Sequence, residues 1–236
     1  MSIKKHIPNT ITCCNLLSGC VSILFTCNDH LLWASAMIFV AAIFDFFDGF
    51  AARALNAKSP IGGELDSLSD VVSFGVAPSF IVAWMLSKTG IGWWIHDVNL
   101  FPMLAFILAA FAAVRLAKFN IDTRQSTSFI GLPVPAVGLF IASLPFMLFG
   151  IENGSLLHQI VMNPYFLLAM VAIFSWLMIS EVPFFSFKIK NLKFKENILR
   201  YFVVIFAIVA VIILKLVALP FVFLFYILLS VICYRG

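Results

Sequence analysis

Long apolar segments follow one another along almost the whole of this chain, and they restrict its fold more than any other feature. We find eight of them, at about residues 10–28, 31–54, 64–87, 100–119, 131–150, 164–187, 198–218 and 220–235. A helix needs about 20 residues to cross the hydrocarbon core of a bilayer, and helices satisfy their own backbone hydrogen bonds there. Because 63% of the 236 residues are hydrophobic and only 11% are charged, the sequence predicts an all-α, polytopic transmembrane helix bundle.

The last two segments meet at Pro220 with almost no loop between them. Proline interrupts the hydrogen bonding of a helix. This region is therefore predicted to be either a tight hairpin or one long kinked span, and the chain is predicted to have six to eight spans.

The positive residues favour one side of the bilayer. With eight spans, 13 of the 15 Lys and Arg residues fall on the same side, and only Lys88 and Lys215 fall on the other. Since positive residues are enriched in cytoplasmic loops, we expect both termini in the cytoplasm. The basic run at 188–195 is expected to contact anionic head groups of membrane lipids. The net charge of +4 thus reflects topology, and we expect no nucleic-acid partner.

Four aspartates lie close together in this otherwise oily chain: Asp45, Asp48, Asp66 and Asp70. A charge near the bilayer interior costs roughly 2.5–3.5 kcal/mol on insertion scales, so such residues need partners. The first two share one face of a helix by their spacing, and the last two share a face of the next helix. Two neighbouring antiparallel helices would therefore point all four carboxylates into one pocket at the cytoplasmic edge of the membrane.

Four converging carboxylates repel one another unless cations neutralise them. Oxygen-only ligands suit hard divalent cations such as Mg²⁺, Mn²⁺ or Ca²⁺, and two-metal sites are typical of displacement at phosphorus. The small residues Gly49 and Ala52 share the face of the first two aspartates and would let a ligand approach closely. Arg53 and Lys58 are placed to hold phosphate oxygens. Paired aspartates in membrane helices also serve ion pathways, so an ion-coupled transporter is the alternative.

The spacing D-x-x-D-G-x-x-A-R-x₈-G-x-x-x-D-x-x-x-D resembles the signature of the CDP-alcohol phosphotransferase family. Every defined position is filled, by Asp45, Asp48, Gly49, Ala52, Arg53, Gly62, Asp66 and Asp70. Residues 65–79, 115–120 and 129–136 are also similar to the membrane-integral phosphatidylserine synthase branch of bacteria and archaea. The resemblance covers about residues 8–150.

This resemblance implies an enzyme that transfers the phosphatidyl group of CDP-diacylglycerol to the hydroxyl of L-serine and releases CMP. It implies two divalent ions, Mg²⁺ or Mn²⁺, bound by Asp45, Asp48, Asp66 and Asp70. It implies a CDP-lipid site that comprises Asp48, Gly49, Ala52, Arg53, Gly62 and Asp66. Asp70 is the implied general base, and a serine hydroxyl does need such a base because it is otherwise a poor nucleophile.

The serine site is less defined by the sequence. Arg115 and Arg124 lie on the predicted metal side and are candidates to pair with the serine carboxylate, although topology alone would also place positive residues there. Asn120 and Ser128 are candidates to hydrogen-bond the substrate or merely to cap helix ends, and the backbone near Gly131 is a further candidate. Another acceptor alcohol, or an archaetidylserine synthase acting on isoprenoid lipid, remains an alternative. The absence of inverted repeats argues against a transporter.

The resemblance also implies a homodimer whose protomers each have six core helices. We expect a bacterial or archaeal inner or plasma membrane as its location, with the active site facing the cytoplasm. One membrane domain is expected over residues 1–236, with the catalytic six-helix core at 1–187. Residues 188–236 are expected to add the basic loop and a C-terminal helical hairpin.

Overall fold

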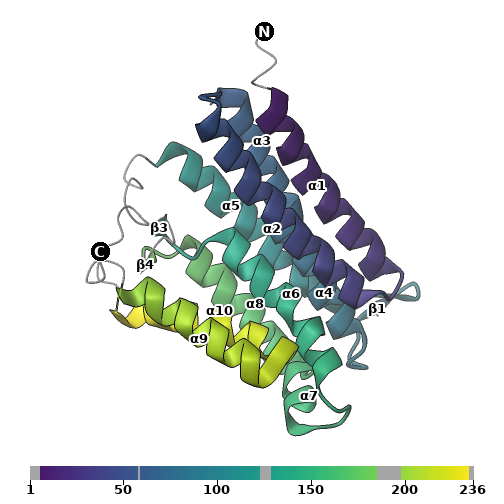
Figure 1. The fold of residues 1–236 in the computed structure, drawn as a ribbon. Helices are drawn as coiled ribbons and strands as arrows, with labels where there is room; N and C mark the ends of the chain where they lie inside the picture. Colours follow the sequence, from purple (N-terminus) through teal and green to yellow (C-terminus); the bar gives the residue numbers. More distant parts are fainter. Residues whose placement is uncertain (1–5, 58, 123–128, 185–197, 234–236) are drawn as a thin grey trace.

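The computed structural model arranges the chain as a bundle of helices (Figure 1) and describes residues 6–57, 59–122, 129–184 and 198–233. The α-helices of these residues are α1 (His6–Cys27), α2 (Leu31–Ala54), α3 (Pro60–Asp70), α4 (Ala77–Ser87), α5 (Ile107–Ile121), α6 (Val134–Gly150), α7 (Leu156–Val161), α8 (Pro164–Ile179), α9 (Ile198–Leu214) and α10 (Ala218–Cys233). Five helical stretches are long and apolar enough to cross a membrane, and α6 and α8 are shorter apolar helices. The predicted all-α polytopic bundle is confirmed.

The third apolar segment is one continuous helical stretch over Pro60–Ser87. Ser59 caps its start by accepting a hydrogen bond from the Gly62 N–H at 3.1 Å, and Pro60 occupies the first turn, so the helix begins before the predicted residue 64. Between α3 and α4 lies a π-helical turn, η2 (Val71–Val76). There the Ala77 N–H donates to the Val72 carbonyl, five residues back, and this wider turn was not predicted.

The sixth apolar segment is shorter than the predicted 164–187, because α8 ends at Ile179. Beyond it the short strand β4 (Pro183–Phe184) pairs antiparallel with β3 (Phe129–Ile130). Pro183 has no N–H for a helical bond, which favours the extended conformation. The Gly131 N–H donates to the Val182 carbonyl at 2.9 Å, so this pairing anchors the entrance to α6.

The C-terminal pair forms the tight hairpin, one of the two predicted alternatives. A short 3₁₀ turn, η5 (Lys215–Val217), joins α9 to α10, and Lys215 has a positive φ of 51°. The rings of Phe206 and Phe225 stack across the pair with centroids 4.2 Å apart. Helix α10 also packs against α6, so the hairpin is attached to the preceding helices.

Helix α1 buries its small and polar side chains and exposes its large apolar ones. The buried residues are Pro8, Thr12, Asn15, Ser18, Gly19, Ser22 and Thr26. Leu17 and Leu24 are 61% and 63% exposed, as suits side chains that face lipid. Because small residues allow close helix approach, α1 packs tightly along α2 and also contacts α3 and η2.

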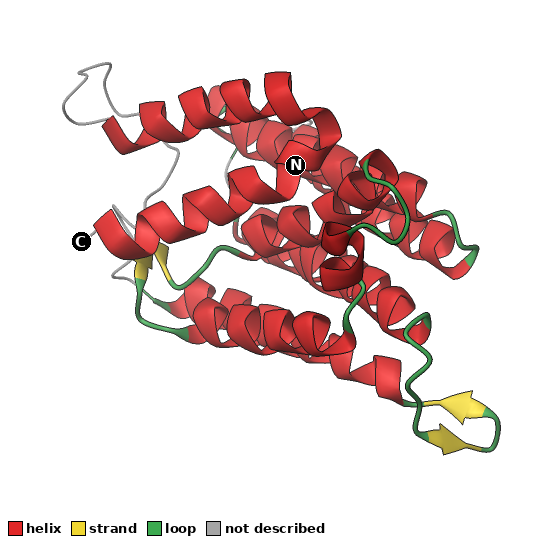
Figure 2. Cartoon of the chain, turned by 90° about the horizontal axis from the view of Figure 1, so that it is seen from below, coloured by secondary structure: helices red, strands yellow, loops and turns green. Residues whose placement is uncertain are grey.

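The two ends of the bundle differ. The starts of α1 and α3 lie at one end in Figure 1, and α7 and strand β1 lie at the other. Strand β1 (Trp94–Ile95) pairs with β2 (Val98–Asn99) in a small hairpin that projects from the helices in Figure 2. Trp93 and Tyr165 are exposed at this second end, as suits aromatic side chains at a membrane–water interface.

Candidate active site

The four aspartates of the sequence motif come from two helices that both pack against α1. Asp45 and Asp48 lie near the C-terminal end of α2, and Asp66 lies on α3. Each of these three offers a carboxylate oxygen within 4.8 Å of the other two. We call these three residues the acidic cluster. Asp48 is buried, and the other two are half-buried.

Asp70 lies one turn further along α3 and has a different environment. It is 7% exposed, and its Oδ1 accepts a hydrogen bond from the Asn15 amide nitrogen at 3.2 Å. Its carboxylate is near enough to the acidic cluster to interact with the charges of Asp45 and Asp66. The structure therefore places three carboxylates together and the fourth beside them, held by a neighbour on α1.

The acidic cluster has carboxylate oxygens that the described protein groups leave unsatisfied. Asp48 Oδ2 and Asp66 Oδ1 are buried and have no hydrogen-bond partner among the described residues. A buried charged oxygen without a partner is costly, and an all-oxygen donor set suits a hard divalent cation. The acidic cluster thus fits a divalent metal ion.

A cavity of about 230 Å³ adjoins the acidic cluster. It is lined by Pro8, Asn9, Thr12, Asp48, Gly49, Ala52, Ala57, Ser59, Gly62, Gly63 and Asp66. The structure therefore brings five of the six residues expected at the CDP-lipid site to one cavity, and two of the cluster carboxylates form part of its wall.

The small residues of the motif keep this cavity open. A Cβ atom added to Gly62 would lie 3.1 Å from both Asn9 Oδ1 and Ser59 Oγ. A Cβ added to Gly49 would lie 3.3 Å from Arg53 Nη1, so the exposed Arg53 side chain folds back along the cavity edge. The sixth expected residue is thus close to the cavity without lining it. Lys58 lies outside the described residues.

Two of the serine-site candidates lie on α5, which contacts the π-helical turn η2 that follows Asp70. Arg115 is 5% exposed, with its guanidinium 5.0 Å from the Phe119 ring, and it interacts electrostatically with Asp70. Asn120 Oδ1 accepts a hydrogen bond from the Ser67 hydroxyl at 3.1 Å, which links the end of α5 to α3. Both candidates are therefore near the carboxylates.

The remaining serine-site candidates have other placements. Arg124 and Ser128 lie outside the described residues. Gly131 has a φ of +78°, and a Cβ added there would lie 2.4 Å from the Met178 carbonyl oxygen. Because its N–H already donates to Val182, Gly131 has a structural role at the β3–β4 junction.

Sequence reasoning missed the contribution of α1. Asn9 and Thr12 line the cavity, and Asn15 binds Asp70. The available signal was the spacing of polar residues three or four positions apart within an apolar segment. It also missed Tyr226 of α10, a buried residue that interacts electrostatically with Arg115.

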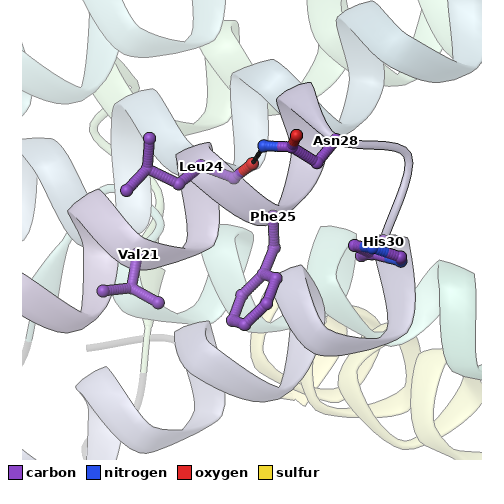
Figure 3. Close-up of a pocket in the computed structure, with 5 residues that line it drawn as sticks. All are labelled: Val21, Leu24, Phe25, Asn28 and His30. Atoms are coloured by element: carbon purple, nitrogen blue, oxygen red, sulfur yellow. Dashed lines mark hydrogen bonds between the residues drawn. The ribbon is translucent and has the colours of Figure 1, made fainter.

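A second cavity, of about 220 Å³, lies at the turn between α1 and α2 (Figure 3). Its lining residues are Val21, Leu24, Phe25, Asn28 and His30. The Asn28 amide donates to the Leu24 carbonyl at 2.8 Å, so its polar group is used locally. Since no carboxylate lines this cavity, we do not assign the chemistry to it.

Comparison with known proteins agrees with the family resemblance of the sequence motif. The family model described as CDP-alcohol phosphatidyltransferase matches residues 5–187. The chain is similar to the CDP-diacylglycerol–serine O-phosphatidyltransferase of Bacillus subtilis (strain 168), with 34% identity over 184 residues, which is 78% of this chain and 92% of that protein.

Proteins of the same name from two other organisms are also similar. The one from Helicobacter pylori (strain J99) is 36% identical over 136 residues, or 57% of this chain and 54% of that protein. The one from Methanocaldococcus jannaschii is 37% identical over 142 residues, or 59% of this chain and 61% of that protein. The match thus spans nearly the whole Bacillus protein but only about half of the Helicobacter protein's length.

Proposed function

Because this chain belongs to the CDP-alcohol phosphatidyltransferase family, we propose that it transfers the phosphatidyl group of CDP-diacylglycerol to L-serine and releases CMP. The observation that carries this proposal is the cavity whose wall includes Asp48 and Asp66 of the acidic cluster. A diphosphate bound there has its phosphorus next to the carboxylates that fit metal ions. The names of the relatives support serine as the acceptor. Family membership also disfavours the transporter alternative.

The cavity residues suit a cytidine diphosphate group. Gly49, Ala52 and Gly62 present small side chains, so the nucleotide can approach the backbone closely. Arg53 is exposed at the cavity edge and is suited to pair with phosphate oxygens. Asn9 contributes an amide from α1 that can hydrogen-bond the nucleotide.

We assign two divalent ions, Mg²⁺ or Mn²⁺, to the acidic cluster together with Asp70. The unsatisfied oxygens of Asp48 and Asp66 support this assignment. When bound, such ions neutralise the carboxylates and stabilise the negative charge that develops at phosphorus. The carboxylates themselves keep the diphosphate from binding without metal, because like charges repel at short range.

Asp70 is assigned as the general base. The serine hydroxyl oxygen forms a bond to the phosphorus of the phosphatidyl group, the bond from that phosphorus to the CMP oxygen breaks, and the hydroxyl proton passes to the Asp70 carboxylate. Asp70 interacts with Arg115, which supports a role for Arg115 in binding the serine carboxylate. Asn120, which is linked to α3 through Ser67, is a further candidate for hydrogen bonding to serine.

We also propose that the acidic cluster faces the cytoplasm, since with eight spans 13 of the 15 Lys and Arg residues fall on that side and positive residues are enriched in cytoplasmic loops. In a chain whose native cysteines are replaced, a cysteine at position 58 should react only from the cytoplasm, and one at position 92 only from outside. Labelling of both from one side would contradict this topology.

Residues 1–236 are proposed to form one membrane domain and to assemble as a homodimer. The packing of α10 against α6, with Tyr226 and Ile227 in the hydrophobic core, supports a single domain. The dimer rests on the family resemblance alone. Measuring the mass of the purified protein in detergent tests it.

The direct test of the activity is CMP release by the purified protein. CDP-diacylglycerol is the donor, and serine, glycerol 3-phosphate, inositol and choline are the acceptors, with an isoprenoid CDP-lipid as a second donor. We expect serine to give the highest kcat/KM. Faster release with another alcohol would assign that alcohol instead, and preference for the isoprenoid donor would indicate an archaetidylserine synthase.

A further inference from the structure

Asn15 is an amide side chain in the membrane-embedded part of α1, and it is 0% exposed. Its amide nitrogen donates to Asp70 Oδ1 at 3.2 Å. Its own Oδ1 is buried and has no hydrogen-bond partner among the described residues. Burying an amide that is only partly hydrogen-bonded costs free energy, so a purely structural reason for asparagine here is weak.

The backbone of Asn15 is fixed by the π-helical turn that follows Asp70. The Ser73 hydroxyl donates to the Asn15 carbonyl at 2.9 Å. One turn along α1, a Cβ added to Gly19 would lie 2.6 Å from Ser73 Oγ and 2.8 Å from Ser73 Cα. This close approach of α1 to η2 restricts the position of Asn15 relative to Asp70.

Helices α5 and α6 contact the π-helical turn on its other sides. A Cβ added to Gly138 of α6 would lie 2.9 Å from Phe74 Cα, and one added to Gly75 would lie 3.0 Å from the Ala112 Cβ on α5. Single π-helical turns are rare and frequently occur at functional sites. Here the turn couples Asp70 to three neighbouring helices.

From these contacts we propose that Asn15 is a positioning residue for Asp70. Its amide fixes one oxygen of the Asp70 carboxylate by a hydrogen bond, so that the other oxygen is kept available for the proton of the acceptor alcohol. Asn15 does not touch the substrate in this scheme, and it acts only through Asp70. The inference rests on the proposed function, because it assumes that Asp70 accepts that proton.

The test compares Asn15→Ala and Asn15→Leu with a matched control, Ser22→Ala. Ser22 lies on the same face of α1, is 0% exposed, and donates to the Ala34 carbonyl at 2.8 Å. Removing the Ser22 hydroxyl therefore also removes a buried hydrogen bond between two helices, but this bond does not involve Asp70. The measurements are kcat and KM for CMP release at a moderate and at a saturating Mg²⁺ concentration, CDP-diacylglycerol binding without acceptor, and the thermal unfolding midpoint in detergent.

We expect kcat of both Asn15 variants to fall about 10- to 150-fold, the range for losing a hydrogen bond to a charged group. KM and CDP-diacylglycerol binding should stay within about threefold, since the nucleotide cavity is lined by other residues of α1. Ser22→Ala should lower the unfolding midpoint about as much as the Asn15 variants do, but its kcat should stay at the wild-type value.

Three outcomes overturn the proposal. These are a normal kcat in the Asn15 variants, an equal loss of kcat in Ser22→Ala, or full restoration of the Asn15 variants by added metal. If neither Asn15 variant folds, Ser73→Ala decides, because it removes only the hydrogen bond to the Asn15 carbonyl. It should lower kcat about 2- to 10-fold, and a normal kcat there overturns the proposal.

The proposed function is judged separately, by wild-type CMP release with serine. If the wild type uses another alcohol, the serine assignment fails, and the Asn15 comparison is made with that alcohol. A wild type that releases CMP with none of the alcohols overturns both, because Asp70 then has no proton to accept.

Discussion

Asp29 and the acidic cluster lie at opposite ends of the bundle, and their carboxylates have different partners. Asp29, in the turn between α1 and α2, is exposed, accepts a hydrogen bond from the Trp84 indole, and lies 3.3 Å from Lys88 Nζ. In the acidic cluster, buried oxygens of Asp48 and Asp66 have no hydrogen-bond partner among the described residues. Described protein groups partner the first carboxylate, whereas oxygens of the second group are left without a partner by the described residues.

The environment of Asp29 has a direct consequence for its protonation. The Trp84 hydrogen bond and then the Lys88 charge lower the pKa of Asp29 below its ordinary value of 3.8. A lowered pKa means that this contribution to stability is complete above the ordinary value, and is lost as the pH falls through the lowered pKa. Because the group is fully exposed, solvent and salt screen the contribution.

The largest expected effect separates these two groups by metal removal. Chelation with excess EDTA should abolish CMP release, because the acidic cluster then repels the diphosphate, and added Mg²⁺ or Mn²⁺ should restore it. Chelation should leave the ion pair of Asp29 with Lys88 intact, because that pair contains no metal. Full activity in excess EDTA would contradict the metal assignment.

The next largest effect distinguishes Asp70 from the residues of the acidic cluster. Asp70→Asn should still bind CDP-diacylglycerol while its kcat falls about 10²- to 10⁴-fold, the usual range for loss of a general base. Asp45→Asn and Asp66→Asn should instead weaken metal binding, so that raised Mg²⁺ partly restores CMP release. Restoration of Asp70→Asn by metal as fully as the other two would remove the distinction.

A smaller effect is expected at Arg115, which interacts electrostatically with Asp70. Arg115→Lys keeps the charge but loses the planar, two-pronged contact with a carboxylate. The KM for serine should rise about tenfold, with the KM for CDP-diacylglycerol nearly unchanged, and preference for serine over serinol should fall. Arg124→Lys tests the other arginine candidate in the same way. A normal KM for serine in both variants would exclude both arginines as partners of the serine carboxylate.

The smallest effect is expected at Asp29. Asp29→Asn removes its charge but keeps its size, and kcat should stay within about twofold because exposed ion pairs contribute little. The difference in unfolding midpoint between this variant and the wild type should shrink on going from pH 7 to below the lowered pKa of Asp29. A large loss of kcat would show that Asp29 is coupled to the acidic cluster.

The sequence was sufficient for the second helix, which is one uninterrupted apolar run, and for the approach of three of the aspartates. The apolar run at 31–54 has the bounds of α2, and the spacing of Asp45, Asp48 and Asp66 was enough to predict their approach. It was not sufficient where distant segments decide the structure. Strand β4 forms because it can pair with β3, and an apolar run followed by Pro183 does not reveal that partner.

The separation of Asp70 from the acidic cluster could not be predicted for a similar reason. Residues 62, 66 and 70 share a face by spacing, which places Asp70 with the others. The structure adds the hydrogen bond from Asn15, a residue 55 positions earlier in the chain. A single asparagine in an apolar segment gives no indication of its partner, because helix packing determines which residues meet.

The π-helical turn at Val71–Val76 also sets the rotational register of the third membrane stretch. Each α-helical residue turns the chain by about 100°, so one residue accommodated in the wider turn offsets α4 about the helix axis relative to α3. Deleting Val72 would restore regular α-helical bonding. It would also rotate the face of α3 that carries Asp66 and Asp70 by about 100° relative to α4. The number of residues between Asp70 and Ala77 is therefore as strict a requirement as their identity, and a one-residue deletion here should be less well tolerated than most side-chain replacements.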